Sequence, residues 1–391
     1  MSTLKRLLRK SDRLVVGLNS GTSMDGVDAC LVRFTGGRGV SGIRLLSFRS
    51  FPFMPGVRRA ILKICDPDFQ KLDETMRLSY ALGEYFAQAA TRIVEESGHS
   101  LSQLDLVGSH GQTIRHLPRK KRSLSHSVRA TLQIGELAVI ANRTGVITVG
   151  DFRASDVAAG GEGAPLTPYC HHFLFAHRGK DIAVVNIGGI ANVTFLPAGC
   201  SPKQILAYDT GPGNMVVDYL AGKLFGKSFD CDGKIALSGT VSPKLLNYLL
   251  RDPYYRRRPP KSTGREKYDQ IFCERLIEKS KSLGLAPKDM IATSSELTVK
   301  TIAQAIKALS RTERIILCGG GALNLYFRKR LSEELEPKEL VTSEKFDIPV
   351  KGMEPLCFAI LANETINGKR TGLPNVTGAK TETILGKICL P

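Results

Sequence analysis

The stretch Leu14–Asp28, LVVGLNSGTSMDGVD, decides our interpretation of the fold. Three apolar residues lead into a turn rich in glycine and hydroxyl side chains, and apolar residues resume at Val27. This pattern predicts a β-hairpin whose turn is longer and more polar than chain reversal requires. Its glycines allow several backbone N–H groups to face one point, which is the geometry of an anion-binding nest. The carboxylates of Asp25 and Asp28 add hard oxygen atoms suited to a partly hydrated Mg²⁺.

The same device recurs twice later in the chain. AVVNIGGIANVTFL (183–196) places two glycines between apolar strands, and RIILCGGGALN (314–324) runs from an apolar strand into three glycines. One such hairpin alone would be an ordinary turn, but three predict a nucleotide held from several sides. No GxxxxGK[ST] P-loop is present, and no GxGxxG opens a helix after the first strand, which argues against P-loop and dinucleotide-binding folds. The layout is that of the actin, hexokinase and Hsp70-type ATPases, so we expect an α/β chain of two ribonuclease H-like domains.

Length and cysteine usage limit the class of protein. With 391 residues, 42% of them hydrophobic, the chain is long enough for two domains with buried cores. Its nine cysteines include no CxxC pair, which favours reduced thiols over a disulfide framework or a zinc site. No signal-peptide core and no run of about eighteen apolar residues is found. We therefore expect a cytoplasmic protein with no membrane partner.

The charge is strongly basic, with 55 Lys and Arg against 37 Asp and Glu and a formal net charge of +18. Such a bias can indicate nucleic-acid or membrane-surface binding. Here the positive residues are scattered, and the densest clusters, 115–122 and 256–261, are expected in loops without interleaved aromatic residues. We expect no nucleic-acid partner. A salt-sensitive gel shift would reveal the alternative, an RNA-binding protein.

The predicted elements follow the ribonuclease H-like order. Strands between residues 15 and 51 precede helices at 57–65 and 73–97, and a further strand from Leu104 ends in a polar turn at 109–113. Residues 118–129 are predicted to be a mobile loop and residues 251–266 a proline-broken ligand arm. Helices are also predicted at 135–142, 214–224, 241–250, 268–283, 296–309 and 351–366. We expect a first domain at 1–148, a second at 149–367, and a tail, 368–391, that returns to the first.

Several blocks of the chain resemble one family from end to end. They are GTSMDGVD (21–28), GSHGQTIRH (108–116), GGEGAPLTP (160–168), NIGGIANVT (186–194), YDTGPGNMVVD (208–218), PKSTGRE (260–266), CGGGALN (318–324), MEPLCFA (353–359) and NVTGA (375–379). In this order they resemble the anhydro-N-acetylmuramic acid kinases. The resemblance implies conversion of 1,6-anhydro-N-acetylmuramic acid with ATP and Mg²⁺ into N-acetylmuramic acid 6-phosphate, an active site in a cleft between two domains, and a homodimer. The chain departs from the family pattern at Asn19, Ala154, Glu162 and Pro355.

Two carboxylates are the candidate catalytic groups. Asp209 ends a predicted strand before a Gly-Pro-Gly turn, too early to cap the helix that begins near Asn214, and the resemblance also points to it as the base that activates water. Glu354 is the second carboxylate by resemblance, although a glutamate in a first helical turn is also favoured by the helix dipole. Asp151 competes with Asp209 for the role of base, and we favour a structural or sugar-orienting role for it.

The expected ligand contacts come from the glycine turns and from two polar blocks. The ATP-binding candidates are Gly21, Thr22, Ser23, Met24, Asp25, Gly26, Val27, Asp28, Gly188, Gly189, Gly319, Gly320, Gly321 and Asn324, with Asp25 holding Mg²⁺ through water. Of these, Thr22, Ser23, Gly188 and Gly189 are expected at the β- and γ-phosphates, and Gly319, Gly320, Gly321 and Asn324 near adenosine. The sugar-binding candidates are Gln112, Thr113, Asp151 and Arg153, and Arg153 could pair with the lactyl carboxylate.

Two other functions share the glycine turns. A plain amino-sugar kinase of the same superfamily is one, although it should not carry GSHGQTIRH together with PKSTGRE. A non-catalytic nucleotide switch of the actin or Hsp70 type is the other, and it should carry a protein-binding appendage that the chain does not show.

Overall fold

The computed structural model describes residues 3–36, 42–66, 68–69, 71–264, 267–309, 311–336 and 338–391. The chain divides into two compact units, Met1–Cys170 with Gly352–Pro391 (domain 1) and His171–Lys351 (domain 2). This division differs from the expected boundary after residue 148, and helix α13 (Met353–Ile366) belongs to domain 1 because it packs on that domain's strands. The tail lies in domain 1, where β12 (Lys387–Cys389) pairs with β6 (Thr148–Gly150).

Domain 1 is built on one mixed sheet of order β12-β6-β4-β1-β2-β3, with β5 paired to β4. Its remaining strands are β1 (Arg13–Ser20), β2 (Gly26–Thr35), β3 (Gly42–Pro52), β4 (Leu106–Ser123) and β5 (His126–Ile134). Strands β1, β2 and β3 are antiparallel, whereas β4 is parallel to β1 and β6 is parallel to β4. This is the ribonuclease H-like arrangement.

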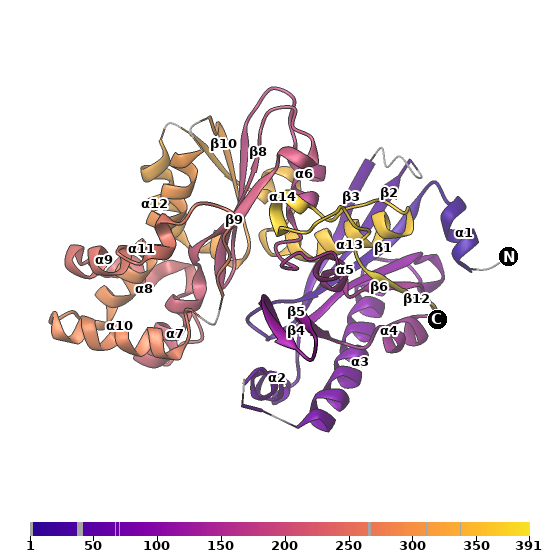
Figure 1. Cartoon of the computed structure of the whole chain (residues 1–391), viewed down its shortest axis with the longest axis horizontal. Coiled ribbons are helices and arrows are strands. Elements are labelled where there is room, and N and C mark those ends of the chain that lie inside the picture. Colours follow the sequence, from indigo (N-terminus) through magenta and orange to yellow (C-terminus); the bar gives the residue numbers. More distant parts are fainter. Residues whose placement is uncertain are drawn as a thin grey trace. The chain divides into compact units, whose positions relative to one another are not determined.

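Helices cover both faces of this sheet (Figure 1). They are α1 (Thr3–Arg9), α2 (Val57–Cys65), α3 (Leu72–Glu96), α4 (Leu137–Thr144), α5 (Phe152–Ala158), α13 and α14 (Pro374–Thr377). Because side chains alternate along a strand, Val16 and Leu18 of β1 join the core formed with α3, whereas Gly17 faces α13. A Cβ on Gly17 would lie 2.0 Å from the carbonyl oxygen of Pro355, so α13 rests directly on the strand backbone.

Domain 2 repeats this topology with the order β11-β10-β7-β8-β9. The strands are β7 (Ile182–Ile187), β8 (Ile190–Leu196), β9 (Leu206–Pro212), β10 (Arg314–Cys318) and β11 (Glu339–Thr342). The first three are antiparallel, and β10 and β11 continue in parallel from β7. Two sheets with one strand order confirm the expected duplicated α/β fold of two ribonuclease H-like domains.

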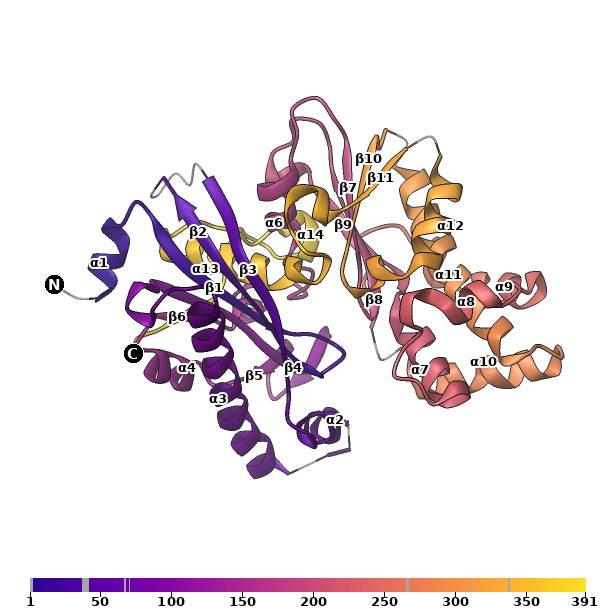
Figure 2. The same cartoon turned by 180° about the vertical axis from the view of Figure 1, so that it is seen from behind.

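The helices of domain 2 gather around one long buried helix. They are α7 (Asn214–Phe225), α8 (Lys234–Ser238), α9 (Pro243–Leu250), α10 (Gln270–Ser282), α11 (Pro287–Ala308) and α12 (Leu325–Leu335), while α6 (Pro168–Phe175) spans the division between the two units. Figure 2 shows α11 and α12 side by side next to the sheet. Helix α11 begins nine residues before the predicted start. Its hydroxyl side chains bond to carbonyls four residues earlier (Thr293 to Asp289, Ser294 to Met290), and this hides the apolar periodicity.

Two further predictions in domain 1 are wrong. Strand β4 does not end in a polar turn at 109–113, and residues 118–129 are not a mobile loop, because β4 continues to Ser123 and pairs with β5 as a hairpin. Arg129 anchors this hairpin by donating to the carbonyls of Pro118 (2.6 Å) and Gly160 (2.5 Å). The charged and hydroxyl side chains that suggested a loop are exposed on the two-stranded ribbon.

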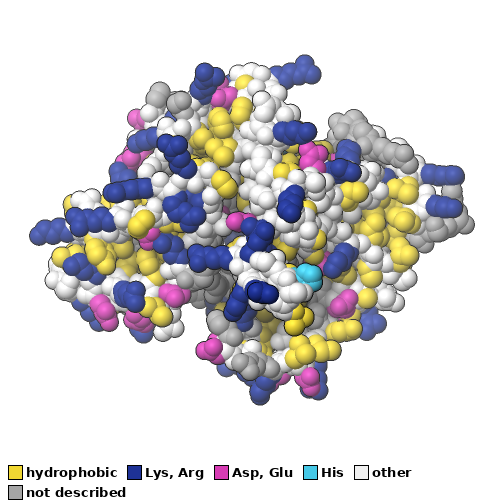
Figure 3. Space-filling view, in the orientation of Figure 1, with side chains coloured by type: hydrophobic (Ala, Val, Ile, Leu, Met, Phe, Trp, Pro, Cys, Tyr) yellow, Lys and Arg dark blue, Asp and Glu magenta, His cyan; other side chains and the backbone are white. Residues whose placement is uncertain are grey.

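Positive side chains (dark blue in Figure 3) are spread over the visible face and do not gather in one patch. Within the described ranges, no helix is both long enough and apolar enough to cross a bilayer.

Candidate functional site

The glycine turn between β1 and β2 is the first candidate ligand site of domain 1. The side chains of Thr22, Ser23 and Asp25 are exposed, and the hydroxyl of Ser23 donates to Asp25 Oδ1 over 2.6 Å. Met24 has a φ of 55°, a left-handed conformation that is uncommon for a residue with a side chain and is often found at functional sites. The turn therefore presents polar groups on a constrained backbone.

Other members of the expected ATP set hold the turn in place. Met24 and Val27 are buried in the core shared with α3, so only their backbone atoms can meet a ligand. Gly26 is required by packing, because a Cβ there would lie 2.4 Å from the carbonyl oxygen of Phe51. Asp28 accepts a hydrogen bond of 2.5 Å from Ser50 of β3.

Gln112 ties the turn to the neighbouring strand β4. Its side chain is only 1% exposed, Oε1 accepts from Ser20 over 2.7 Å, and Nε2 donates to the carbonyls of Thr113 (3.2 Å) and Gly21 (3.5 Å). Both ends of the amide are thus bonded within the protein. Gln112 therefore supports the glycine turn between β1 and β2, and a direct sugar contact by its side chain stays a prediction.

Glu354 lies beside the same turn, although it is far away in sequence. It occupies the first turn of α13, and its Oε2 accepts a 2.6 Å hydrogen bond from Nδ2 of Asn19 at the end of β1. A Cβ on Gly21 would lie 4.0 Å from each of these two atoms. The carboxylate and the amide therefore pack directly under the first glycine of the turn.

Arg153, a residue of α5, is held by two fixed acceptors outside that helix. Nε donates to Nε2 of His110 over 3.0 Å, and Nη1 donates to the carbonyl of Gly163 over 2.7 Å. The other ring nitrogen of His110, Nδ1, lies 3.1 Å from the carbonyl of Gly111, so it carries the proton and the imidazole is neutral. Burial, together with the nearby Arg153, holds the pKa of His110 well below its usual value. His110 thus fixes the guanidinium of Arg153.

The loop contacted by Arg153 is fastened from within by a buried carboxylate. Asp156 accepts from the backbone N–H of Gly163 (2.8 Å) and from the hydroxyl of Thr377 (2.7 Å), and burial raises its pKa. Asp151, at the start of α5, has a φ of 52° and forms an ion pair with Lys387 of β12. Thr113 accepts a 3.2 Å hydrogen bond from Gln133. Asp156 thus ties the GGEGAPL block to α5, Asp151 ties the start of α5 to β12, and Thr113 is bonded within the β4–β5 ladder.

Asp209 is the candidate catalytic carboxylate of domain 2. It lies half-buried on β9, and its Oδ2 accepts from the backbone N–H of Thr263 over 3.0 Å. Its main-chain oxygen accepts from the hydroxyl of Tyr254 over 2.8 Å. Helix α7 is capped at Gly213, so Asp209 does not serve as a helix cap.

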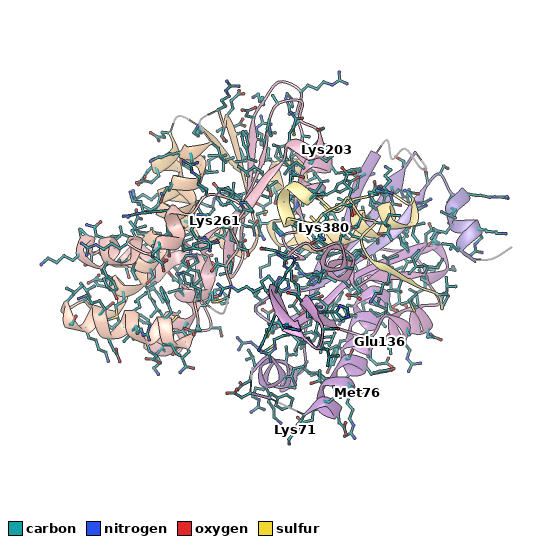
Figure 4. The ribbon with its side chains drawn as sticks, in the orientation of Figure 1. Lys71, Met76, Glu136, Lys203, Lys261 and Lys380 are labelled. Carbon is teal, nitrogen blue, oxygen red and sulfur yellow. The ribbon has the colours of Figure 1, made fainter. Side chains whose placement is uncertain are left out.

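The expected ligand arm packs around Asp209 in an ordered way as far as Gly264, whereas Arg265 and Glu266 lie outside the described residues. The ammonium of Lys261, labelled in Figure 4, lies 4.9 Å and 5.4 Å from the ring centroids of Tyr254 and Tyr208. It also donates to the carbonyls of Tyr254 (3.3 Å) and Tyr255 (3.4 Å). Burial lowers the pKa of Lys261, and Arg257 adds to this effect. Cation–π contacts and hydrogen bonds therefore fix the backbone that reaches the carboxylate.

The Gly188–Gly189 turn of domain 2 is committed in part to helix α7. The carbonyl of Gly188 accepts from the N–H of Asn214, and the carbonyl of Gly189 accepts from those of Gly213 and Met215, over 2.8 to 3.1 Å. A Cβ on Gly213 would lie 2.2 Å from the carbonyl oxygen of Gly188. Gly213 is thus needed here for close packing against the turn, whether or not a phosphate binds.

The third glycine turn divides in the same way. A Cβ on Gly319 would lie 2.2 Å from Oδ1 of Asn186, and one on Gly321 would lie 2.3 Å from the Ile187 side chain. Gly320 is exposed, and a Cβ there would make only an ordinary contact of 3.9 Å with the end of the Lys351 side chain. The side-chain oxygen of Asn324 accepts from the N–H groups of Tyr326 (2.9 Å) and Phe327 (3.3 Å) and caps α12. Of these four residues, Gly320 is the one best placed to contact a nucleotide.

Sequence reasoning missed the residues that position the predicted ones. They are Asn19 and Ser20 beside the first glycine turn, Asp156 inside the 160–163 loop, and Tyr254 and Thr263 around Asp209. Asn19 and Ser20 lie in the stretch 14–28 and Thr263 lies in the block 260–266, both of which we had singled out, so their polar side chains were a usable signal. Asp156 and Tyr254 lie outside the quoted blocks, and nothing local indicates that the loop with Tyr254 folds back to β9.

Known proteins of one family match almost the whole chain. A model of the anhydro-N-acetylmuramic acid kinase family matches residues 13–391. The chain is 41% identical over 397 residues to the anhydro-N-acetylmuramic acid kinase of Caldanaerobacter subterraneus subsp. tengcongensis, and 41% identical over 395 residues to that of Salinibacter ruber, with 100% of both chains covered in each case. It is also 41% identical over 377 residues to the enzyme of Gloeobacter violaceus, covering 96% of this chain and 98% of the relative. The chain therefore belongs to the anhydro-N-acetylmuramic acid kinase family and is an enzyme, a phosphotransferase with an alcohol acceptor.

Proposed function

We propose that the enzyme opens the 1,6-anhydro ring of 1,6-anhydro-N-acetylmuramic acid with water and transfers the γ-phosphoryl group of ATP to O6, giving N-acetylmuramic acid 6-phosphate. Such a reaction would recycle a peptidoglycan sugar. The observation that carries this proposal is Asp209, a carboxylate held on both sides by the 254–263 segment and not used as a helix cap. A base that is oriented in this way is what activation of water requires.

The reaction couples two bond changes. Water attacks C1 and gives a proton to the Asp209 carboxylate while the C1–O6 bond breaks. The departing O6 takes the γ-phosphoryl group, and ADP leaves with the pair of electrons of the broken phosphoanhydride bond. No separate acid is needed for O6, because O6 leaves directly onto phosphorus.

The exposed turn of domain 1 supports binding of the ATP phosphates. Its backbone N–H groups and the hydroxyls of Thr22 and Ser23 are donors suited to phosphate oxygens, and Gly320 of domain 2 is suited to the nucleotide. Within the described part of the chain, no group of three or more His, Cys, Asp or Glu side chains is arranged to hold a metal ion directly. This fits Mg²⁺ that is held mainly by phosphates and water, with Asp25 as the outer contact.

Binding of the sugar is supported by the anchored guanidinium of Arg153, which is suited to the lactyl carboxylate. Asp151 and Thr113 are the other sugar contacts that we propose for this domain. We place Glu354 at the water or the sugar as the second carboxylate. We also propose, from the family resemblance, that the enzyme is cytoplasmic and forms a homodimer, which light scattering would show as about twice the chain mass of 42.6 kDa.

The test is an assay with Mg-ATP and 1,6-anhydro-N-acetylmuramic acid in ¹⁸O-water, read by mass spectrometry. The expected product carries one phosphate and one heavy oxygen at C1. Because the C1 hydroxyl of a free sugar exchanges with water, unlabelled N-acetylmuramic acid 6-phosphate is incubated alongside, and samples are quenched before it exchanges. Asp209→Asn should abolish the product, whereas Asp232→Asn, a change of an exposed carboxylate in the same domain, should not.

Each other outcome points to a defined alternative. Phosphate incorporation without heavy oxygen would indicate a plain amino-sugar kinase and remove the role of Asp209. ATP binding without any product would favour the nucleotide switch. Full activity of Asp209→Asn would refute the assignment of the base.

A further inference from the structure

The side chain of Asn19 is hydrogen-bonded to the side chain of Glu354. The Asn19 side chain is 3% exposed, and its Nδ2 donates to Glu354 Oε2 over 2.6 Å. The bond joins the amide at the end of β1 to the carboxyl group in the first turn of α13. The two residues are separated by 335 positions in sequence, so the bond is a product of the fold alone.

The bond exists because α13 lies directly on β1. Gly17 has no side chain, and this lets the backbone at Pro355 approach the strand. The first turn of α13 then lies next to the last residues of β1, where the strand passes into the glycine turn that leads to β2. Asn19 occupies that position, and it reaches Glu354 without any change in the ladder that pairs it with Asp28.

A carboxylate in this place needs to be held. Glutamate has three rotatable side-chain bonds and loses rotamer freedom when it is fixed. Glu354 lies close to Gly21, in the glycine turn between β1 and β2 that we propose binds phosphate. Because such a turn attracts anions, it would pull a carboxylate that is not held into other orientations. The amide of Asn19 offers a fixed donor and adds no positive charge that would neutralise the carboxylate.

We propose that Asn19 is the positioning residue for Glu354, and that its amide selects the rotamer in which this carboxylate takes part in the reaction. The inference rests on the proposed function, because it requires a catalytic role for Glu354. Asn19 itself touches neither the sugar nor the phosphates. Its effect on the rate is transmitted entirely through the carboxylate.

The test is a double-mutant cycle on kcat and on KM for ATP and for the sugar, with the full chain throughout. The single variants are Asn19→Leu, which keeps the branched shape of the side chain and removes the donor, and Glu354→Gln. The third variant combines both changes. Loss of one hydrogen bond to a charged group should lower the kcat of Asn19→Leu about tenfold to hundredfold, with both KM values nearly unchanged.

Non-additivity is the decisive readout. Glu354→Gln should lower kcat at least as much as Asn19→Leu, and the double variant should be no slower than Glu354→Gln alone. Thermal midpoints of all variants show whether Asn19→Leu folds, and Asn19→Met provides a second apolar replacement with a more flexible side chain if it does not. A purely structural role would lower the midpoint and leave the two effects on kcat additive.

The failure of each idea is distinguishable. If Glu354→Gln retains the wild-type kcat, Glu354 has no catalytic role, and the inference about Asn19 falls with it. If Glu354→Gln is slow but Asn19→Leu and Asn19→Met are both as fast as the wild type, or if the effects add, then Asn19 does not position Glu354 and the proposed function stands.

Discussion

Replacing Gly17 by alanine tests the contact that brings α13, and with it Glu354, onto β1. The new methyl group would lie 2.0 Å from the carbonyl oxygen of Pro355, 2.9 Å from its carbonyl carbon and 3.0 Å from Cβ of Ala359. The first two are backbone atoms, so no side-chain rotation can relieve the overlap. Strand and helix must therefore separate by about 1 Å or more to reach ordinary contact distances.

This displacement sets the expected magnitudes. Overpacking of a core by one methyl group costs about 1–3 kcal/mol, and the rigid backbone on both sides puts Gly17→Ala at the upper end of that range. Because the first turn of α13 carries Glu354, the same shift should lower kcat by about a hundredfold, the typical loss for a misplacement of about 1 Å.

The assay combines urea unfolding with hydrogen exchange of the peptide that covers residues 353–366, which reports on α13 itself. The matched control is Gly222→Ala in α7, where the nearest contact of the added Cβ is 3.7 Å away and the helix should gain about 0.5–1 kcal/mol. Wild-type exchange in 353–366 together with an unchanged urea midpoint for Gly17→Ala would refute the close seating of α13 on β1.

Two further predictions concern domain 2. Burial lowers the pKa of His171 to about 3 from 6.5, so between these values the unfolded chain binds a proton that the folded chain does not, and stability falls as the pH falls. At pH 5 the free energy of unfolding should be about 2 kcal/mol lower than at pH 8. The thermal midpoints at pH 8 and pH 5 should therefore differ more for the wild type than for His171→Gln. Equal differences would contradict the prediction. Tyr254→Phe removes the hydrogen bond to the main chain of Asp209 and should lower kcat about twofold to tenfold. Tyr219→Phe, which removes a bond to Glu274 on the surface side of α7, is the control, and equal rates for the two variants would show that the Tyr254 hydroxyl does not support Asp209.

Local sequence patterns were sufficient for much of the fold. Helix α2 lies at the predicted residues and α3 within one residue of them, because both carry apolar residues at helical spacing between clear ends. The strand–glycine–strand units predicted both sheets, because alternation and turn chemistry act over a few residues. The hairpin at 106–134 was missed, since its distal half is polar on both faces and its pairing is set by register and by Arg129.

The sequence by itself determined the family, the two ribonuclease H-like domains, and the candidate carboxylates Asp209 and Glu354, because these depend on motifs that are contiguous in the chain. Only the tertiary structure decided what each polar side chain in those motifs bonds to. It assigned Gln112 and Asn324 to support and capping, and it paired Asn19 with Glu354 and Thr263 with Asp209. The physical reason is that a hydrogen bond acts over about 3 Å in space and is independent of separation along the chain, so its partners exist only once the strands and helices have packed.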